Sequence, residues 1–98
     1  METLGEIIRV EREKRSLLLR QVAASIEVDQ ALISKFERGE RLPTKEQVIR
    51  LAKFYSLSEN TLVTAWLADK ILTEVRHEKL GLRAMKLAEA KIKSGIKD

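Results

Sequence analysis

The chain has 98 residues, of which 44% are hydrophobic and 35% charged, and its formal net charge at pH 7 is +4. This length suits one compact domain, and the hydrophobic fraction excludes a chain that is disordered throughout. The absence of cysteine excludes disulfides and thiolate metal sites, and no run reaches the roughly 18 apolar residues of a membrane span.

The opening METLGEIIRVEREK alternates in charge and lacks the apolar core of a signal peptide. We therefore expect a cytoplasmic protein. The single histidine, His77, has no second histidine at helical spacing, so we expect a solvated helix residue there rather than a metal ligand. We expect no cofactor.

Apolar residues recur at helical spacing along almost the whole chain, which predicts an all-α fold. The first helix should begin after Thr3 as its N-cap and run to about residue 15. A short second helix should cover residues 19–26. Asp29 should cap a third helix, which Gly39 should end in a left-handed conformation.

Thr44 and Gln47 have the spacing of a capping box, so a fourth helix should begin at Lys45. Ser58 should cap a fifth helix, and the helical pattern then continues to Gly81 and through a last stretch, LRAMKLAEAKIKSG. The prediction is a five-helix domain over residues 1–67 and a C-terminal helical extension over residues 68–98.

The second and third helices have the spacing of a helix-turn-helix, in which the small Ala23 allows a close crossing. The apolar side of the third helix faces the core, so its outer side should present Gln30, Ala31, Ser34 and Lys35. Glutamine bonds adenine, lysine donates to guanine and alanine touches the thymine methyl group, so this helix suits the major groove. Arg38, Arg41 and Lys45 follow where duplex phosphates would run.

The run LRQVAASIEVDQALISKFERGERLPTKEQVIRLAKFYSLS closely resembles the phage-repressor/Cro-type (XRE-like) helix-turn-helix family. The resemblance covers about residues 4–67. It implies base contacts by the same four residues, with phosphate contacts by Arg38, Arg41, Lys45 and residues near the start of the second helix. It also implies a structural ion pair between Arg12 and Glu37.

Two positions depart from the family pattern. Leu18 and Leu19 stand where a Ser or Thr cap and a phosphate-binding Gln are usual, and Arg20 is the candidate replacement. Glu27 stands at the usual turn glycine, which implies either a left-handed residue or a different turn.

A single recognition helix reads few base pairs, so two copies on two half-sites would gain specificity. The stripe Met85, Ala88 and Ile92 is either packed on its own domain or shared with a second copy. Trp66 is expected to be a core or an interface anchor. We predict a homodimer joined through the fifth helix and the C-terminal helix, with these four residues in its interface.

The leading hypothesis is a sequence-specific transcriptional regulator that binds a DNA operator, as a dimeric repressor associated with the bacterial nucleoid when bound. A restriction-modification controller or a self-repressing antitoxin belongs to the same class. The alternative is a protein-interaction or adaptor module, such as an antitoxin, that keeps the fold without strong DNA binding. An enzyme is the weakest interpretation, because no catalytic triad, phosphate loop or ligand cluster is present.

Overall fold

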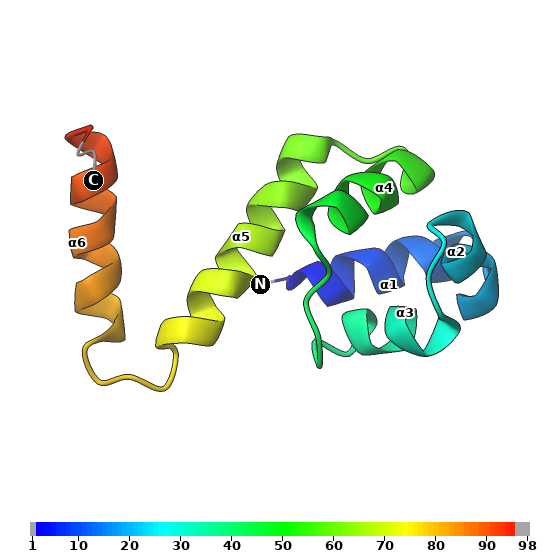
Figure 1. Ribbon diagram of the computed structural model, residues 1–98, viewed down its shortest axis with the longest axis horizontal. Helices are drawn as coiled ribbons and strands as arrows, with labels where there is room; N and C mark the ends of the chain where they lie inside the picture. The colour runs from blue at the N-terminus through cyan, green and yellow to red at the C-terminus, as the bar shows by residue number, and fades with distance from the viewer. Residues whose placement is uncertain (1, 96–98) are drawn as a thin grey trace.

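A computed structural model describes residues 2–95, and these residues form six α-helices and no strand. Five helices make one packed body, and the sixth lies in the C-terminal extension (Figure 1). The predicted all-α fold is therefore confirmed. The helices are α1 (Leu4–Lys14), α2 (Leu19–Ser25), α3 (Gln30–Glu37), α4 (Lys45–Tyr55), α5 (Glu59–Val75) and α6 (Gly81–Lys93).

Four of the helices begin at the caps that the sequence predicts. The side-chain oxygens of Thr3, Asp29, Thr44 and Ser58 each accept a backbone N–H of the first turn that follows. Each cap satisfies one of the N–H groups that a helix start leaves without an intrahelical partner. The N-terminal ends of α1, α3, α4 and α5 are therefore fixed by local chemistry.

The core of the body is built from all five of its helices. Its side chains are aliphatic or aromatic, which is what the helical spacing of the apolar residues predicts. The most deeply buried large side chains are Leu4, Ile8, Val22, Ile26, Ile33, Val48, Leu51, Tyr55 and Leu62.

Trp66 belongs to this core. Its side chain is 8% exposed, and its Nε1–H donates to the carbonyl oxygen of Pro43 at 2.7 Å. The Lys70 ammonium lies 4.5 Å from the centre of its ring and covers it from outside. These contacts place Trp66 in the core of the body, one of the two places expected for it, and its role in the dimer interface stays a prediction.

A carboxylate of α5 fixes the start of α1. Asp69 accepts the backbone N–H of Leu4 at 2.9 Å, across 65 positions of sequence. Because the first N–H groups of a helix carry partial positive charge, an aspartate is favourable here. The contact joins the first and the fifth helix of the body.

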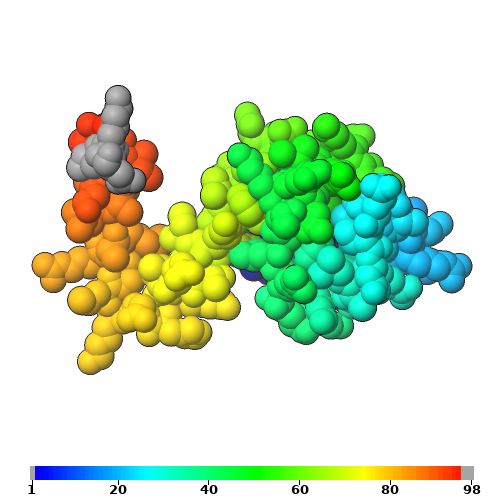
Figure 2. All heavy atoms as spheres, in the orientation of Figure 1, coloured from blue at the N-terminus to red at the C-terminus, as the bar shows by residue number. Residues whose placement is uncertain are grey.

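Helix α6 stands apart from the body, as the ribbon and the space-filling view both show (Figures 1 and 2). Of its residues only Gly81 is buried, and a Cβ added there would collide with the carbonyl oxygen of Val75. Helix α5 passes residue 67 and ends at Val75, so the extension begins as a continuation of the body's last helix.

Candidate nucleic-acid interface

The turn between α2 and α3 sets the angle at which α3 leaves the body. The backbone N–H of Val28 donates to the carbonyl oxygen of Ala23 at 3.0 Å, and Glu27 adopts a left-handed conformation with φ 59°. Ala23 is buried, which allows the two helices to pack closely. Of the two alternatives for this position, a left-handed residue or a different turn, the structure has the left-handed residue.

Helix α3 divides into a buried and an exposed side. Ile33, Phe36 and Glu37 are buried, whereas Gln30, Ala31 and Lys35 are exposed and Ser34 is half-buried. Residues four positions apart share one helical face, so Gln30 lines up with Ser34 and Ala31 lines up with Lys35. The four candidate base-contacting residues thus form one polar surface, which the buried side supports from behind.

Two contacts with α1 hold the C-terminal end of α3. The Arg12 guanidinium donates to both carboxylate oxygens of Glu37, at 2.8 and 3.0 Å, and to the carbonyl oxygen of Leu17 at 3.0 Å. The hydrogen bond with Glu37 raises the pKa of Arg12. This bidentate ion pair is largely shielded from solvent, so it fixes the direction of α3.

The second contact is a close approach of backbones. A Cβ added at Gly5 would lie 2.5 Å from the carbonyl oxygen of Phe36 and 2.6 Å from that of Glu37. Only glycine lets the first turn of α1 lie this close to the end of α3.

The candidate phosphate-contacting residues Arg20, Arg38, Arg41 and Lys45 are all exposed. Within the described part of the chain, Arg20, Arg41 and Lys45 form no ion pair, and neither does the base-contacting candidate Lys35. These four cations are therefore free to bind an anionic ligand.

Arg38 is already engaged. Its guanidinium donates to the two carboxylate oxygens of Glu40 at 2.6 and 3.2 Å and to the hydroxyl oxygen of Ser34 at 2.8 Å. The hydrogen bond between them raises the pKa of Arg38 and lowers that of Glu40, so both groups are charged at neutral pH. A phosphate that binds Arg38 must therefore compete with Glu40.

The start of α2 shows what replaces the usual cap. The side chain of Leu18 has no oxygen to accept an N–H, but the side-chain oxygen of Gln21 accepts the backbone N–H of Leu18 at 2.8 Å. Leu18 itself is half exposed. The only glutamine of this helix thus serves the backbone, while Arg20 beside it projects into solvent.

Contacts between distant parts of the chain escaped the sequence analysis. Besides the Asp69 contact, the Arg50 guanidinium lies 3.4 Å from the Glu27 carboxylate and 3.5 Å from the carbonyl oxygen of Ile26, next to the turn. No local pattern marks such partners, since they come together only when α4 and α5 pack against the first three helices.

Three of the four residues predicted for the dimer interface lie in the C-terminal extension. Half-buried Met85 and exposed Ala88 and Ile92 line a groove of about 510 Å³, together with Leu82 of α6 and Ile71 of α5. Of the body's helices, α5 lines this groove through Ile71, and the sharing of the stripe with a second copy stays a prediction.

Residues 2–95 hold no group of three or more His, Asp or Glu side chains that could bind a metal ion. None of their helices combines the length and the apolar character that crossing a membrane requires.

The chain matches the model of a known protein family. The family model described as a helix-turn-helix domain covers residues 3–65, which agrees with the resemblance to the phage-repressor/Cro-type family. A comparison with curated proteins finds no match. Domains of this kind are typical of DNA-binding regulators and are typically not enzymes.

Proposed function

We propose that this chain, which belongs to the helix-turn-helix domain family, is a sequence-specific transcriptional regulator that reads DNA with α3. One observation supports this most directly. The exposed side of α3 presents an amide, a methyl, a hydroxyl and an ammonium group, while its other side is fixed in the core.

These groups match the chemistry of the major groove. Gln30 would bond adenine, Lys35 would donate to guanine, and Ala31 would contact a thymine methyl group. Ser34 would bond a base edge once Arg38 turns toward the backbone, since the Arg38 guanidinium now occupies the Ser34 hydroxyl. Base contacts of this kind choose the sequence.

Cations around α3 would supply the phosphate contacts. Arg20 precedes it, Arg41 follows it, and Lys45 opens α4, whose N-terminal N–H groups also favour an anion. Such contacts give affinity and register without sequence preference, and they make binding depend steeply on salt.

The regulator would act as a homodimer that represses by occupying an operator, in the cytoplasm and on the bacterial nucleoid. The groove lined by Met85, Ala88 and Ile92 supports self-association through the extension, residues 68–98, because it leaves apolar side chains exposed. Two copies would read half-sites about one helical turn apart, roughly 34 Å.

The alternative is an adaptor module without strong DNA binding, such as an antitoxin. Its support comes from the exposed carboxylates of Glu27, Asp29 and Glu40, which lie close to α3 and would repel phosphate. Exposed Leu18 at the start of α2 also suits a protein partner better than a phosphate.

Selection from a random duplex pool, followed by sequencing of the bound fraction, separates the two functions. A regulator should enrich one motif, and its affinity for that motif should fall steeply with salt. Enrichment of no motif, together with salt-independent binding, would identify the adaptor.

Two substitutions then test the roles of single residues on the selected site. Lys35→Ala should cost about 1–3 kcal/mol and relax one base position, whereas Arg41→Ala should weaken all duplexes alike. Lys53→Ala, which removes an exposed lysine on α4, is the matched control and should change neither property. Equal effects of Lys35→Ala and Lys53→Ala would refute base reading by α3.

A further inference from the structure

The positive charge of the chain is unevenly distributed. Residues 1–75, which include the whole five-helix body, hold 12 Lys and Arg and 12 Asp and Glu side chains. Residues 76–95 hold six Lys and Arg and only two Glu. The formal net charge of +4 therefore resides in the segment of residues 76–95, which we call the basic extension.

The cations of the basic extension are also less engaged than those of the body. In the body, Arg9, Arg12, Lys14, Arg15, Arg38 and Arg50 form ion pairs. In the basic extension only Lys93 does, at 3.8 Å from Glu89. Among the described residues, no carboxylate pairs with Arg76, Lys79, Arg83, Lys86 or Lys91.

The basic extension begins beside the end of α3. A groove of about 280 Å³ is lined by Arg38, Gly39 and Leu42 after α3 and by Leu72, Thr73 and Arg76 at the end of α5. A strand of DNA that follows the C-terminal end of α3 would therefore meet Arg76 next.

Three carboxylates also line this groove, and each has a partner. Glu37 is held by Arg12, Asp69 accepts the Leu4 backbone N–H, and Glu6 accepts the Thr3 hydroxyl at 3.1 Å. The guanidinium of Arg76 is thus the cation of this groove without an ion-pair partner in the described chain.

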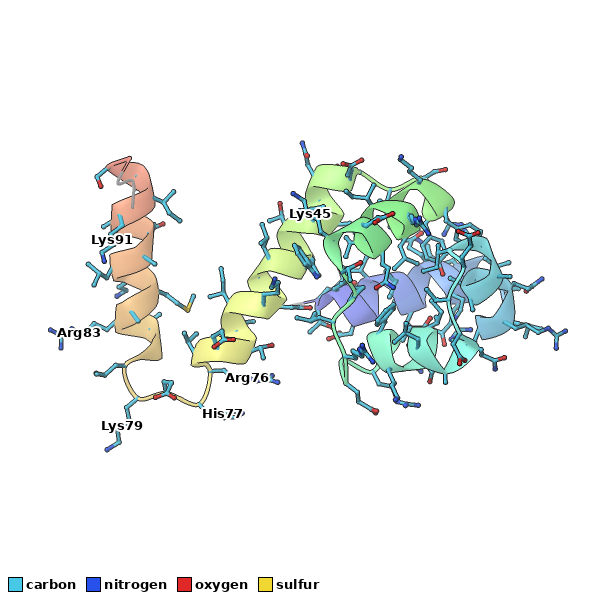
Figure 3. All side chains as sticks on the ribbon, viewed as in Figure 1. Lys45, Arg76, His77, Lys79, Arg83 and Lys91 are labelled. Atoms are coloured by element: carbon cyan, nitrogen blue, oxygen red, sulfur yellow. The ribbon has the colours of Figure 1, made fainter. Side chains whose placement is uncertain are left out.

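Figure 3 shows how the next cations continue outward from the groove. Arg76, His77 and Lys79 lie on the connection between α5 and α6, and Lys79 projects away from it into solvent. Arg83 and Lys91 lie on the side of α6 that faces away from α5. Arg83 and Lys91 therefore remain accessible when the apolar groove between α5 and α6 is filled, whereas Lys86 and Lys93 line that groove.

We propose that the basic extension is a second phosphate-binding element of the DNA interface, in which Arg76 and Lys79 bind the phosphates next to those at the end of α3. The inference rests on the proposed function, because it places the duplex against α3. A body without net charge gains little long-range attraction for DNA, and the extension supplies it. Arginine and lysine on an exposed connection bind phosphate without reading sequence.

The test compares two double variants of the full chain that remove equal charge. Arg76→Gln with Lys79→Gln removes the proposed contacts, whereas Arg9→Gln with Lys53→Gln removes two exposed cations of the body outside the candidate interface. Binding to the selected duplex and to an unrelated duplex is followed by fluorescence anisotropy at increasing salt. Circular dichroism and light scattering check that fold and oligomeric state are unchanged.

The extension variant should bind both duplexes at least roughly tenfold more weakly, with the slope of log affinity against log salt lowered by about 1.8 for each bound chain. The control should keep the slope of the wild-type chain. A wild-type slope in the extension variant, with Lys35→Ala still losing its base preference, would overturn the inference and leave the proposed function intact.

Other outcomes separate the two claims further. If the wild-type chain binds all duplexes alike and the extension variant loses this binding, the extension binds DNA but the sequence-specific function is refuted. If the extension variant loses binding only to phosphatidylglycerol vesicles and keeps its DNA affinity, the extension is a membrane-binding element and the inference is wrong.

Discussion

At the residue scale, Tyr55 combines deep burial with a hydroxyl group that has no hydrogen-bond partner among the described residues. Burial raises the pKa of Tyr55 to about 12, and the carboxylate of Glu37 contributes in the same direction. The Arg15 guanidinium covers the ring at 5.1 Å and donates to the Tyr55 carbonyl oxygen at 2.7 Å. The ring is therefore held by its packing and by Arg15, while the hydroxyl adds little to the stability of the fold.

Tyr55→Phe should leave stability at pH 7 unchanged or raise it slightly, because an unsatisfied buried hydroxyl costs free energy. Above pH 10 the unfolded tyrosine loses its proton while the folded one keeps it until about pH 12. The free energy of unfolding of the wild-type chain should therefore fall over this range by on the order of 2 kcal/mol more than that of the variant. Urea unfolding between pH 8 and 12 measures the difference, and parallel curves would contradict the assignment.

The Arg12–Glu37 pair gives a second prediction at this scale. Arg12→Ala should lower the free energy of unfolding by on the order of 3 kcal/mol, because it leaves the Glu37 carboxylate buried without its cation. The matched control on the same helix is Arg9→Ala, whose pair with Glu13 is more than half exposed. It should cost less than about 1 kcal/mol, and equal losses in chemical denaturation would show that the buried pair has no special role.

At the element scale, the helix-turn-helix holds a left-handed residue with a Cβ. Glu27 adopts φ 59° at a position where glycine pays no steric penalty. Its only side-chain partner among residues 2–95 is Arg50 at 3.4 Å, in a contact open to solvent. The turn is therefore formed in spite of its sequence, by the packing of the helices on either side.

Glu27→Gly should raise the free energy of unfolding by about 0.5–1 kcal/mol, because it removes the left-handed strain and loses only an exposed ion pair. Glu27→Ala is the control, since it removes the same ion pair but keeps a Cβ, and it should not stabilise the chain. Thermal or urea unfolding of both variants tests the prediction. Stabilisation by alanine as large as by glycine would point to charge rather than backbone conformation.

The sequence predicts the elements better than their assembly. Helix starts depend on a cap and its neighbours within three positions, so Thr3, Asp29, Thr44 and Ser58 could be identified directly. The contact between Asp69 and Leu4 and the hydrogen bond from Trp66 to Pro43 join distant positions, so no local pattern reveals them. The exposed side of α3 follows from periodicity, whereas the engagement of Arg38 by Glu40 depends on side-chain geometry after Gly39.

At the scale of the whole molecule, the body and α6 differ in how they are stabilised. The body has a shared core, but an isolated helix of 13 residues is marginal in water. Helix α6 also keeps Leu82, Leu87 and Ile92 exposed. A partner that covers these side chains would stabilise the helix, which agrees with the proposed homodimer.

Met85→Asp with Ile92→Asp should abolish the dimer, because two carboxylates would be buried in an apolar interface. Light scattering at tens of micromolar should then give the mass of one chain instead of two. Ala90→Asp, on the other side of α6, is the control and should keep the dimer. A dimer that survives the double variant, or a wild-type chain that is a monomer, would contradict the proposed assembly.

The separation of α6 from the body also determines how a single chain behaves in solution. Its radius of gyration is 15.3 Å and its longest dimension 43 Å, whereas a compact chain of this length would have a radius of about 13 Å. Its drag should exceed that of a sphere of equal mass, so its elution volume alone would suggest a heavier particle. Small-angle X-ray scattering of a monomeric variant would distinguish this extended shape from a chain whose last helix folds back.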